Sequence, residues 1–302
     1  MTWFKGNTHT HTSRSDGDTS LEKVVRWYAA RNYDWLAITD HWKALSREDA
    51  ERLSADCGIV VIPGVELSAK TAHVVALGVP DDCPPQTIKS ETTLDKLQQS
   101  VDWVRAHGGI PILAHPNWMY PWNIAELEKI RDCNLFEVHN AGPDCNTFAA
   151  GGKPGTDDLW DAALNKGIRI YGVGCDDSHH FKRKSFHKGH TTAHGGEGWT
   201  YIEAVRCDEA SVLNALTQGR CVASSGAAPV RADFIDGVYR VEITDPYEWF
   251  QFTTTFIGPD GILAEAHGRQ VEFRPAKNVA WMRARVFCSS GRYLWTQPAF
   301  HS

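Results

Sequence analysis

Short apolar runs alternate with amphipathic stretches through residues 1–225. Residues 21–28 repeat apolar side chains at the spacing of one helical face, and residues 35–38 form an unbroken apolar run typical of a buried strand. Because strands and helices that alternate along a chain usually build a parallel sheet, the pattern predicts an α/β fold. The number of such units fits an open sheet or a closed barrel.

The same pattern places the other elements of this part. Beyond a first strand around Trp3 and Phe4, strands are predicted over 35–38, 59–62, 72–78, 110–114, 135–138, 168–173, 200–205 and 221–223. Helices are predicted over 21–32, 46–55, 94–108, 124–131, 156–165 and 209–217. Thr19 and Glu22 form a capping-box pattern that makes Thr19 the expected N-cap of the first helix, and Thr156 or Asp157 is expected to cap the fifth.

The pattern changes after Ser225 and Gly226. Short alternating segments follow at 239–243, 249–256, 271–273 and 280–287, and the Gly-Pro-Asp-Gly run at 258–261 is a turn signal. We therefore expect two parts: a barrel over residues 1–225, and a small antiparallel β unit over residues 226–302 that packs on it.

Size and composition suit a globular enzyme. The 302 residues allow one large domain or a medium domain with a small one, and 42% apolar with 23% charged residues is an ordinary balance. A net charge of -6 gives no basic field for nucleic acid or an anionic membrane. No apolar run is long enough to span a bilayer and no N-terminal export signal is visible, so the expected location is cytoplasmic.

The cysteines give no sign of a metal site, whereas the histidines do. The eight cysteines include no Cys-x-x-Cys pair, so reduced thiols are expected rather than a zinc–cysteine site. The fourteen histidines are more informative, because many of them follow predicted strands.

The first of these groups lies in the segment between the first strand and the first helix. His9 and His11 are one residue apart, so their side chains point to the same side of an extended chain, and Asp16 follows on the loop. Two imidazoles placed in this way can hold one transition-metal ion. The triplet Thr39-Asp40-His41 directly follows the next strand, as active-site residues do at the carboxyl ends of parallel strands.

Similar groups follow most of the predicted strands. The candidate metal ligands are His9, His11, Asp16, His41, Glu66, His73, His115, Asp177 and His179. A single histidine is more often a hydrogen-bonded core residue, and a single carboxylate can cap a helix or turn. Nine such groups at one barrel mouth, however, would repel or desolvate one another without cations. Mixed nitrogen and oxygen ligands favour Zn, Mn or Fe, and Glu66 could bridge two ions held close together.

These motifs, taken in order, resemble those of the PHP (polymerase and histidinol phosphatase) superfamily: His9-Thr10-His11, Ser15-Asp16-Gly17, Thr39-Asp40-His41, Gly64-Val65-Glu66, His73, Ala114-His115-Pro116 and Asp177-Ser178-His179. The resemblance implies a distorted (β/α)7 barrel with a trinuclear metal site, so that two to three divalent transition-metal ions are expected as cofactors. It assigns His9, His11, Glu66 and Asp177 to one ion, Glu66, His73 and His115 to a second, and Asp16, His41 and His179 to a third. Asp176 and Asp177 are both candidates, and the family's Asp-x-His pattern favours Asp177.

The C-terminal run from Gly291 to Pro298 resembles the β-extension of the CehA/McbA-type branch of PHP metallohydrolases. That branch is named for carbamate ester hydrolysis, so this second resemblance keeps acyl substrates open beside phosphate esters.

Several residues near the candidate ligands could contact substrate. Arg14 could bind a substrate anion or pair with a surface carboxylate, and His139, Asn140 and His180 could contact substrate or support the ligands. The loop over residues 181–198 could cover the site, with His187, His190 and His194 more typical of a solvated loop. The side chains of Trp42, Trp118 and Trp122 could line a pocket for a planar group or simply pack at the rim.

The favoured hypothesis is a phosphoesterase that acts on a small-molecule ester. Two metals would share a water and lower its pKa, and the resulting hydroxide would attack phosphorus in line. The third metal and Arg14 would neutralise phosphoryl oxygens, while a metal-bound water or His179 assists the leaving oxygen. The alternatives are a carbamate, carboxyl-ester or amide hydrolase that uses the same metals, and a non-catalytic metal-binding module.

Overall fold

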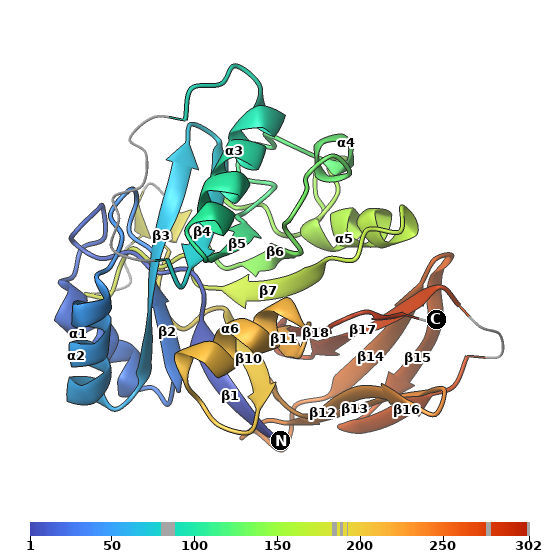
Figure 1. Ribbon diagram of the computed structural model, residues 1–302. Helices are drawn as coiled ribbons and strands as arrows, with labels where there is room; N and C mark the ends of the chain where they lie inside the picture. The colour runs from blue at the N-terminus through green and yellow to red at the C-terminus, as the bar shows by residue number, and fades with distance from the viewer. Residues whose placement is uncertain (80–87, 183–185, 188–189, 192, 276–278, 301–302) are drawn as a thin grey trace.

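The computed structural model describes residues 1–79, 88–182, 186–187, 190–191, 193–275 and 279–300. Its N-terminal part is a curved mixed sheet covered by helices, and the C-terminal strands lie to one side of it (Figure 1). The helices are α1 (Leu21–Ala29), α2 (Arg47–Cys57), α3 (Thr93–Ala106), α4 (Ile124–Leu127), α5 (Thr156–Asn165) and α6 (Glu209–Thr217). The strands of this part are β1 (Thr2–Asn7), β2 (Trp35–Ile38), β3 (Val60–Ala69), β4 (Ala72–Leu77), β5 (Ile110–Leu113), β6 (Leu135–Asn140), β7 (Tyr171–Cys175), β8 (Phe186–His187), β9 (His190–Thr191), β10 (Trp199–Ala204) and β11 (Cys221–Ser224).

The sheet is mixed, with parallel strands at its centre. β1, β2 and β3 run parallel, as do β5, β6 and β7, whereas β4 is antiparallel to both β3 and β5. β10 and β11 continue the sheet beyond β1 in antiparallel fashion. The predicted α/β fold with a parallel sheet is confirmed. Strict alternation of strand and helix fails at β3 and β4, which form a hairpin with Lys70 at φ +60° in its turn.

The two ends of this curved sheet approach each other. Thr10 pairs with Ser178 in an isolated parallel bridge just beyond β1 and β7, and His11 N donates to Ser178 O. Between β7 and β10, the backbone N–H of Gly174 donates to Thr200 Oγ1. Consequently the residues that follow β1 and those that follow β7 lie side by side, although they are far apart in the sequence.

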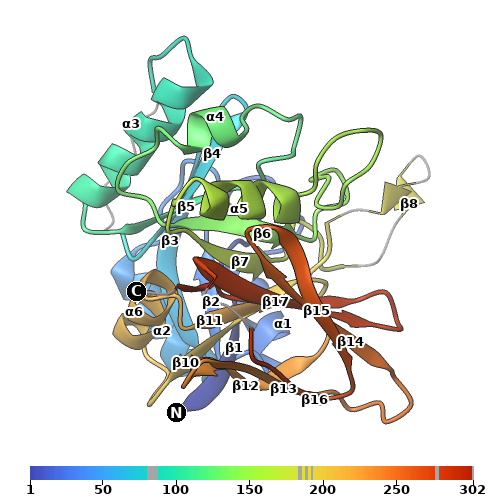
Figure 2. The same ribbon diagram turned by 90° about the vertical axis from the view of Figure 1, so that its right-hand side faces the viewer.

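The C-terminal part consists of antiparallel strands: β12 (Ala228–Ile235), β13 (Val238–Thr244), β14 (Phe252–Gly258), β15 (Gly261–His267), β16 (Gln270–Phe273), β17 (Trp281–Cys288), β18 (Tyr293–Thr296) and β19 (Ala299–Phe300). β18 pairs with β11, so the sheet of the N-terminal part continues into this one (Figure 1). Figure 2 shows β12, β13 and β16 below β14 and β15. β12, β13 and β16 form a second sheet, and side chains such as Phe256 and Leu294 fill the core beside it. The boundary between residues 225 and 226 stays a prediction.

Several predicted details are wrong. Ser20, not Thr19, is the N-cap residue of α1, because the Thr19 hydroxyl donates to Asp18 instead. Gly155 occupies the N-cap of α5, in place of Thr156 or Asp157. β3 runs on through Glu66 to Ala69, α4 is a single turn, β7 begins only at Tyr171, and β12 and β15 were not predicted.

The predicted loop at 181–198 lies partly outside the described residues. The sequence also predicts a surface loop at 80–90, rich in Pro and Asp, of which residues 80–87 are not described. Within the described ranges, no helix combines the length and the apolar character needed to cross a bilayer.

Candidate metal centre

The chain segments that follow β1 and β7 and the middle of β3 bring four predicted ligands together. His9 Nε2 lies 3.2 Å from Glu66 Oε2 and 3.4 Å from Asp177 Oδ1. His11 Nε2 lies 3.3 Å and 3.2 Å from the same two oxygens, and 3.0 Å from His9 Nε2. Both imidazoles are fully buried. We call these four residues the first group.

The spacing of the first group matches what a metal ion requires. Tetrahedral ligands at bond lengths of about 2.0–2.2 Å lie roughly 3.3–3.6 Å apart, close to the distances from the two imidazole nitrogens to each carboxylate oxygen. In addition, Glu66 Oε2 is buried among imidazole nitrogens, with His41 Nδ1 at 2.9 Å as a further neighbour. A buried carboxylate oxygen that faces imidazole nitrogens needs a proton or a cation between them, and an ion would satisfy all of these atoms at once.

The other oxygen of Glu66 faces a second group. Glu66 Oε1 lies 2.8 Å from His73 Nδ1 and 3.2 Å from His115 Nε2, and all three side chains are buried. The hairpin of β3 and β4 supplies Glu66 and His73, and His115 follows β5. Glu66 therefore stands between the two groups with one oxygen toward each, as a carboxylate that bridges two ions would.

Asp16 joins a third group at the surface of the site. Asp16 Oδ2 lies 3.4 Å from His41 Nε2 and 3.4 Å from His179 Nε2, and the Asp16 side chain is 54% exposed. The ring of His11 stacks on that of His179 at 4.1 Å, which connects this group to the first. The predicted ligands thus form one continuous cluster that is buried at Glu66 and reaches solvent at Asp16.

Hydrogen bonds to the far side of several rings determine which nitrogen faces the cluster. His9 Nδ1 lies 2.7 Å from Glu137 Oε1, His73 Nε2 lies 2.8 Å from the carbonyl of Lys70, and His179 Nδ1 lies 2.9 Å from the carbonyl of Asp177. Because these oxygens can only accept, each ring donates there and keeps its other nitrogen free to bind a metal.

Glu137 is a site residue that the sequence analysis missed. It lies within β6, is fully buried, and accepts hydrogen bonds from His9, from the backbone N–H of His115 and from Asn140 Nδ2. The only signal in the sequence is a carboxylate inside the apolar run Leu135-Phe136-Glu137-Val138. Such a charge needs a buried partner, but the run does not say which one.

Backbone strain coincides with two of the candidate ligands. His115 has φ +23° and Asp177 has φ +47°, a conformation that residues other than glycine adopt only at a cost in energy. Each lies two residues beyond the end of a strand, His115 after β5 and Asp177 after β7.

The electrostatics of the cluster call for positive charge. Burial by itself would lower the pKa of His9, but the neighbouring carboxylates, that of Asp177 above all, raise it well above its usual value. Burial would also lower the pKa of His41, but the carboxylates of Glu66 and Asp16 raise it to about 10. Burial would raise the pKa of Glu66, yet the imidazoles, His9 first, hold it well below its usual range. The carboxylates are thus ionised and favour cations beside them.

Of the two aspartates that follow β7, Asp177 is the one that faces the first group. Asp176 is fully buried and accepts hydrogen bonds from Tyr28 and from the backbone N–H groups of residues 196–198. Burial, opposed by these hydrogen bonds, raises the pKa of Asp176 to about 6. The geometry supports Asp177 as the ligand and gives Asp176 the task of holding the 196–198 segment.

The residues predicted to contact substrate have different partners, and only some of these partners belong to the cluster. Asn140 Nδ2 donates to Asp177 Oδ2 at 3.1 Å, so this side chain touches a candidate ligand. Arg14 Nη2 donates to the carbonyl of Ala44, and Nη1 lies 3.8 Å from Asp40 Oδ2. The geometry therefore favours carboxylate pairing for Arg14, although Asp40 is fully buried rather than at the surface. His180 Nδ1 lies 3.4 Å from Asp18 Oδ2, and Asp18 is not one of the candidate ligands.

His139 and the predicted rim residues complete the surroundings. His139 is buried and its ring stacks on Trp295, and burial lowers its pKa to about 4. Trp118 lies against the rings of His73 and His115, whereas Trp122 packs in the core. Of the three loop histidines, His194 lies near His180, and the side chains of His187 and His190 are not described.

The fold and this cluster define a mixed α/β protein with a candidate centre for divalent metals. Residues 7–111 match the family model of the PHP domain, and this match confirms the resemblance to that superfamily. The likeness to the CehA/McbA branch stays a prediction.

Two relatives show how far the similarity extends. The phosphoribosyl 1,2-cyclic phosphate 1,2-diphosphodiesterase of Eggerthella lenta is 29% identical over 101 residues, which are 32% of this chain and 38% of that protein. A two-domain protein from Bacteroides vulgatus that contains a predicted PHP-like metal-dependent phosphoesterase has a similar structure, with a TM-score of 0.56 and 16% identity over 100% of this chain and 87% of that one. At that identity the second likeness shows the fold alone.

Proposed function

We propose that this chain is a metal-dependent phosphoesterase built on a distorted seven-stranded PHP barrel, with a small-molecule phosphate ester as its substrate. The observation that carries the proposal is the position of Glu66, whose two oxygens face two different sets of imidazoles. The PHP match and the phosphodiesterase relative favour phosphate chemistry over other hydrolysis.

The first and second groups are the proposed ligands of two ions that share Glu66, and Asp16, His41 and His179 would hold a third. The donor set fits Mn, Zn or Fe. Such ions would supply an acidified water as nucleophile and positive charge beside the phosphoryl oxygens.

The protein's own residues prepare that centre. Glu137 holds the ring of His9, and Asn140 holds Asp177, so the ligands keep their orientation when the charge around them changes. Asp16 is the most exposed of the candidate ligands, and therefore substrate reaches the cluster from its side. Arg14 acts through Asp40, which accepts hydrogen bonds from Thr12 N and Oγ1 and thereby shapes the loop that carries His11 and Asp16.

Elemental analysis of the purified protein, together with a substrate panel, tests the proposal. Turnover of a phosphomonoester, a phosphodiester and an aryl carbamate is measured with Mn and with Zn. We expect two to three ions per chain, and a higher kcat/KM for one of the phosphate esters than for the carbamate. A large preference for the carbamate would establish the acyl-hydrolase alternative instead.

The variant Glu66→Ala separates an enzyme from a non-catalytic metal-binding module. Loss of the shared carboxylate should abolish turnover, while Glu248→Ala, a change at an exposed site outside the cluster, should leave it intact. Full turnover by Glu66→Ala would remove the bridging role. Absence of turnover by the metal-loaded protein on every ester of the panel would favour the binding module.

A further inference from the structure

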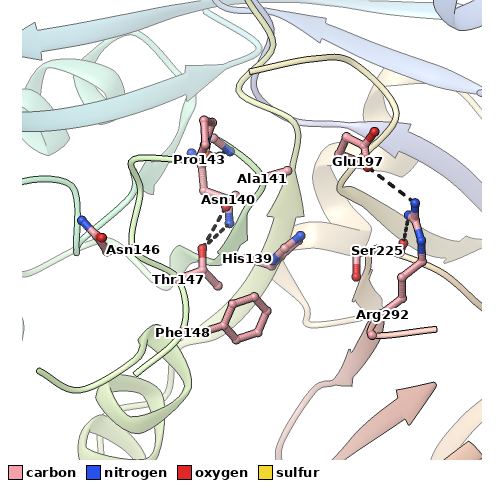
Figure 3. A pocket seen from close by; sticks show the side chains of 12 residues that line it. His139, Asn140, Ala141, Pro143, Asn146, Thr147, Phe148, Glu197, Ser225 and Arg292 are labelled. Atoms are coloured by element: carbon pink, nitrogen blue, oxygen red, sulfur yellow. Dashed lines mark hydrogen bonds and ion pairs between the residues drawn. The ribbon is translucent and has the colours of Figure 1, made fainter. Parts of the chain in front are cut away.

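A cavity lies beside the cluster of candidate metal ligands, between the two parts of the chain. Its volume is about 510 Å³, within the usual range of roughly 300–1,000 Å³ for small-molecule pockets. In Figure 3, Thr147 and Phe148 from the loop after β6 form one wall, and Glu197, Ser225 and Arg292 form the other, with His139 between them. The C-terminal part therefore contributes to this cavity through Arg292.

The cavity contains a buried histidine. His139 is only 6% exposed, and neither of its ring nitrogens makes a hydrogen bond of good geometry with the part of the chain that the structure describes, although the backbone of Glu197 lies close enough to raise its pKa against the effect of burial. The His139 ring stacks on that of Trp295 at 5.0 Å, and Trp295 does not itself line the cavity. Because buried polar atoms are nearly always paired, the ring nitrogens of His139 point to a ligand with a hydrogen-bonding group.

The backbone directs His139 into this cavity. The pairing of β6 with β7 shifts its register between Glu137 and His139, an irregularity that lets two residues of one strand serve different sites. Gly198 makes room for the ring, since a Cβ atom there would lie 2.9 Å from His139 Cδ2. Glu137 can thus orient a candidate metal ligand while His139 faces the cavity.

Aromatic rings provide a surface for a flat group. The ring centroid of Phe148 lies 6.3 Å from that of His139 and 5.3 Å from that of Tyr293, which in turn stacks on Trp295. Phe148 is 52% exposed, so much of its ring is open to a ligand. Flat rings gain more from such a surface than saturated rings of the same size.

The charges in the wall balance each other. Arg292 Nη2 lies 3.5 Å from Glu197 Oε2, and the same guanidinium donates to the carbonyl of Ser225. The cavity therefore offers no net charge, which suits an uncharged ligand group.

One side chain links this cavity to the metal cluster. Asn140 lines the cavity, and its Nδ2 atom donates both to Glu137 Oε2 and to Asp177 Oδ2. A molecule with one end at the candidate metals could therefore extend past Asn140 and place its other end against His139 and Phe148.

We infer that this cavity binds the non-phosphoryl part of the substrate, and that this part is an uncharged flat ring that stacks on Phe148 and hydrogen-bonds to His139. The inference rests on the proposed function for the chemistry at the metals. It assigns Phe148 and His139 to substrate specificity and gives the C-terminal part, through Arg292, a share in the substrate site.

Two esters with leaving alcohols of similar basicity test the inference: benzyl phosphate and cyclohexylmethyl phosphate. We expect kcat/KM to favour the benzyl ester by about 3- to 10-fold, the range of one aromatic contact. Phe148→Ala should remove that preference through a higher KM with little change in kcat, and Phe148→Tyr should keep it. Trp249→Ala, which removes another exposed aromatic ring at a distant loop, should change neither value.

Binding of free benzyl alcohol to metal-free protein gives a readout without turnover. We expect benzyl alcohol to shift the NMR resonances of His139 and Phe148 in the wild-type protein, and cyclohexylmethanol to shift them less. In Phe148→Ala, benzyl alcohol should no longer shift the His139 resonances. His139→Asn should weaken binding further, provided that its melting temperature shows a folded protein.

Equal kcat/KM for the two esters, or the same benzyl preference in Phe148→Ala as in wild type, would overturn the inference. Shifts at residues away from the cavity would do the same. If no phosphate ester is hydrolysed but benzyl alcohol still binds at His139, the proposed function fails and the ring-binding cavity remains.

Discussion

The Nδ1 atom of His9 lies 2.7 Å from Oε1 of Glu137, and both side chains are fully buried. Because a carboxylate only accepts hydrogen bonds, the pair fixes Nδ1 as the donor and presents Nε2 to the first group. This contact joins positions 128 residues apart and lies directly behind the proposed metal centre.

Replacement of Glu137 by Gln tests that support. The amide can still accept from His9, but it lacks the charge that makes the ring a strong ligand. We expect metal affinity to fall by about 10- to 100-fold, the usual cost of losing such a partner. Titration of the metal-free variant with Mn or Zn measures it, with Glu248→Gln as an exposed control. An unchanged affinity would show that Glu137 only fills space.

Asp40 is expected to hold the loop that carries His11 and Asp16. It is fully buried and accepts hydrogen bonds from Thr12 N, from Thr12 Oγ1 and from Ser15 Oγ. In Asp40→Asn one acceptor oxygen becomes an amide nitrogen, so a buried donor loses its partner, at a cost of about 1–3 kcal/mol. Denaturant unfolding measures this loss, and Asp260→Asn at an exposed turn is the control. Equal stability of wild type and Asp40→Asn would contradict the role.

The sequence predicts those structural features and site residues whose causes lie within a few neighbouring positions of the chain. His9 and His11 were predicted as a pair because their spacing and their place after a strand are local features, and the helix over residues 209–217 follows from periodicity alone. Glu137 was missed because its reason for being buried, His9, lies in a different part of the sequence. The cap of α1 was misplaced because Thr19 and Ser20 both suit that position.

β3 shows the same limit at the level of secondary structure. The sequence predicts a strand that ends at Ile62, and Pro63 and Gly64, residues that normally interrupt strands, follow it. In the structure, residues 64–69 pair with residues 72–77 of β4, and this pairing extends β3 to Ala69. This extension places Glu66 beside His73, and one hairpin therefore supplies candidate ligands to both the first and the second group.

Gly6 is expected to be essential for the start of the site segment. A Cβ atom at this position would lie 2.0 Å from Cδ2 and Cε2 of Trp35, whose side chain is fully buried. Gly6→Ala should therefore destabilise the protein by about 1–3 kcal/mol or more, as overpacking does. The double variant Gly6→Ala/Trp35→Leu should be less destabilised than the sum of its single variants, because the smaller side chain relieves the clash. Strict additivity in urea unfolding would contradict this explanation.

Metal removal should lower stability, because ions that bind only the folded cluster favour folding by mass action. At a free metal concentration about 1,000 times the dissociation constant, the gain is about 4 kcal/mol for one site. We expect chelator-treated protein to melt at a lower temperature than protein reloaded with Mn, Zn or Fe. The gain should vanish in Glu66→Ala, which lacks the shared carboxylate, and persist in part in Asp16→Asn, because Asp16 belongs only to the exposed third group. If none of the three metals raises the melting temperature of the wild-type chain, the cluster does not bind ions in the folded state, and the proposed chemistry loses its basis.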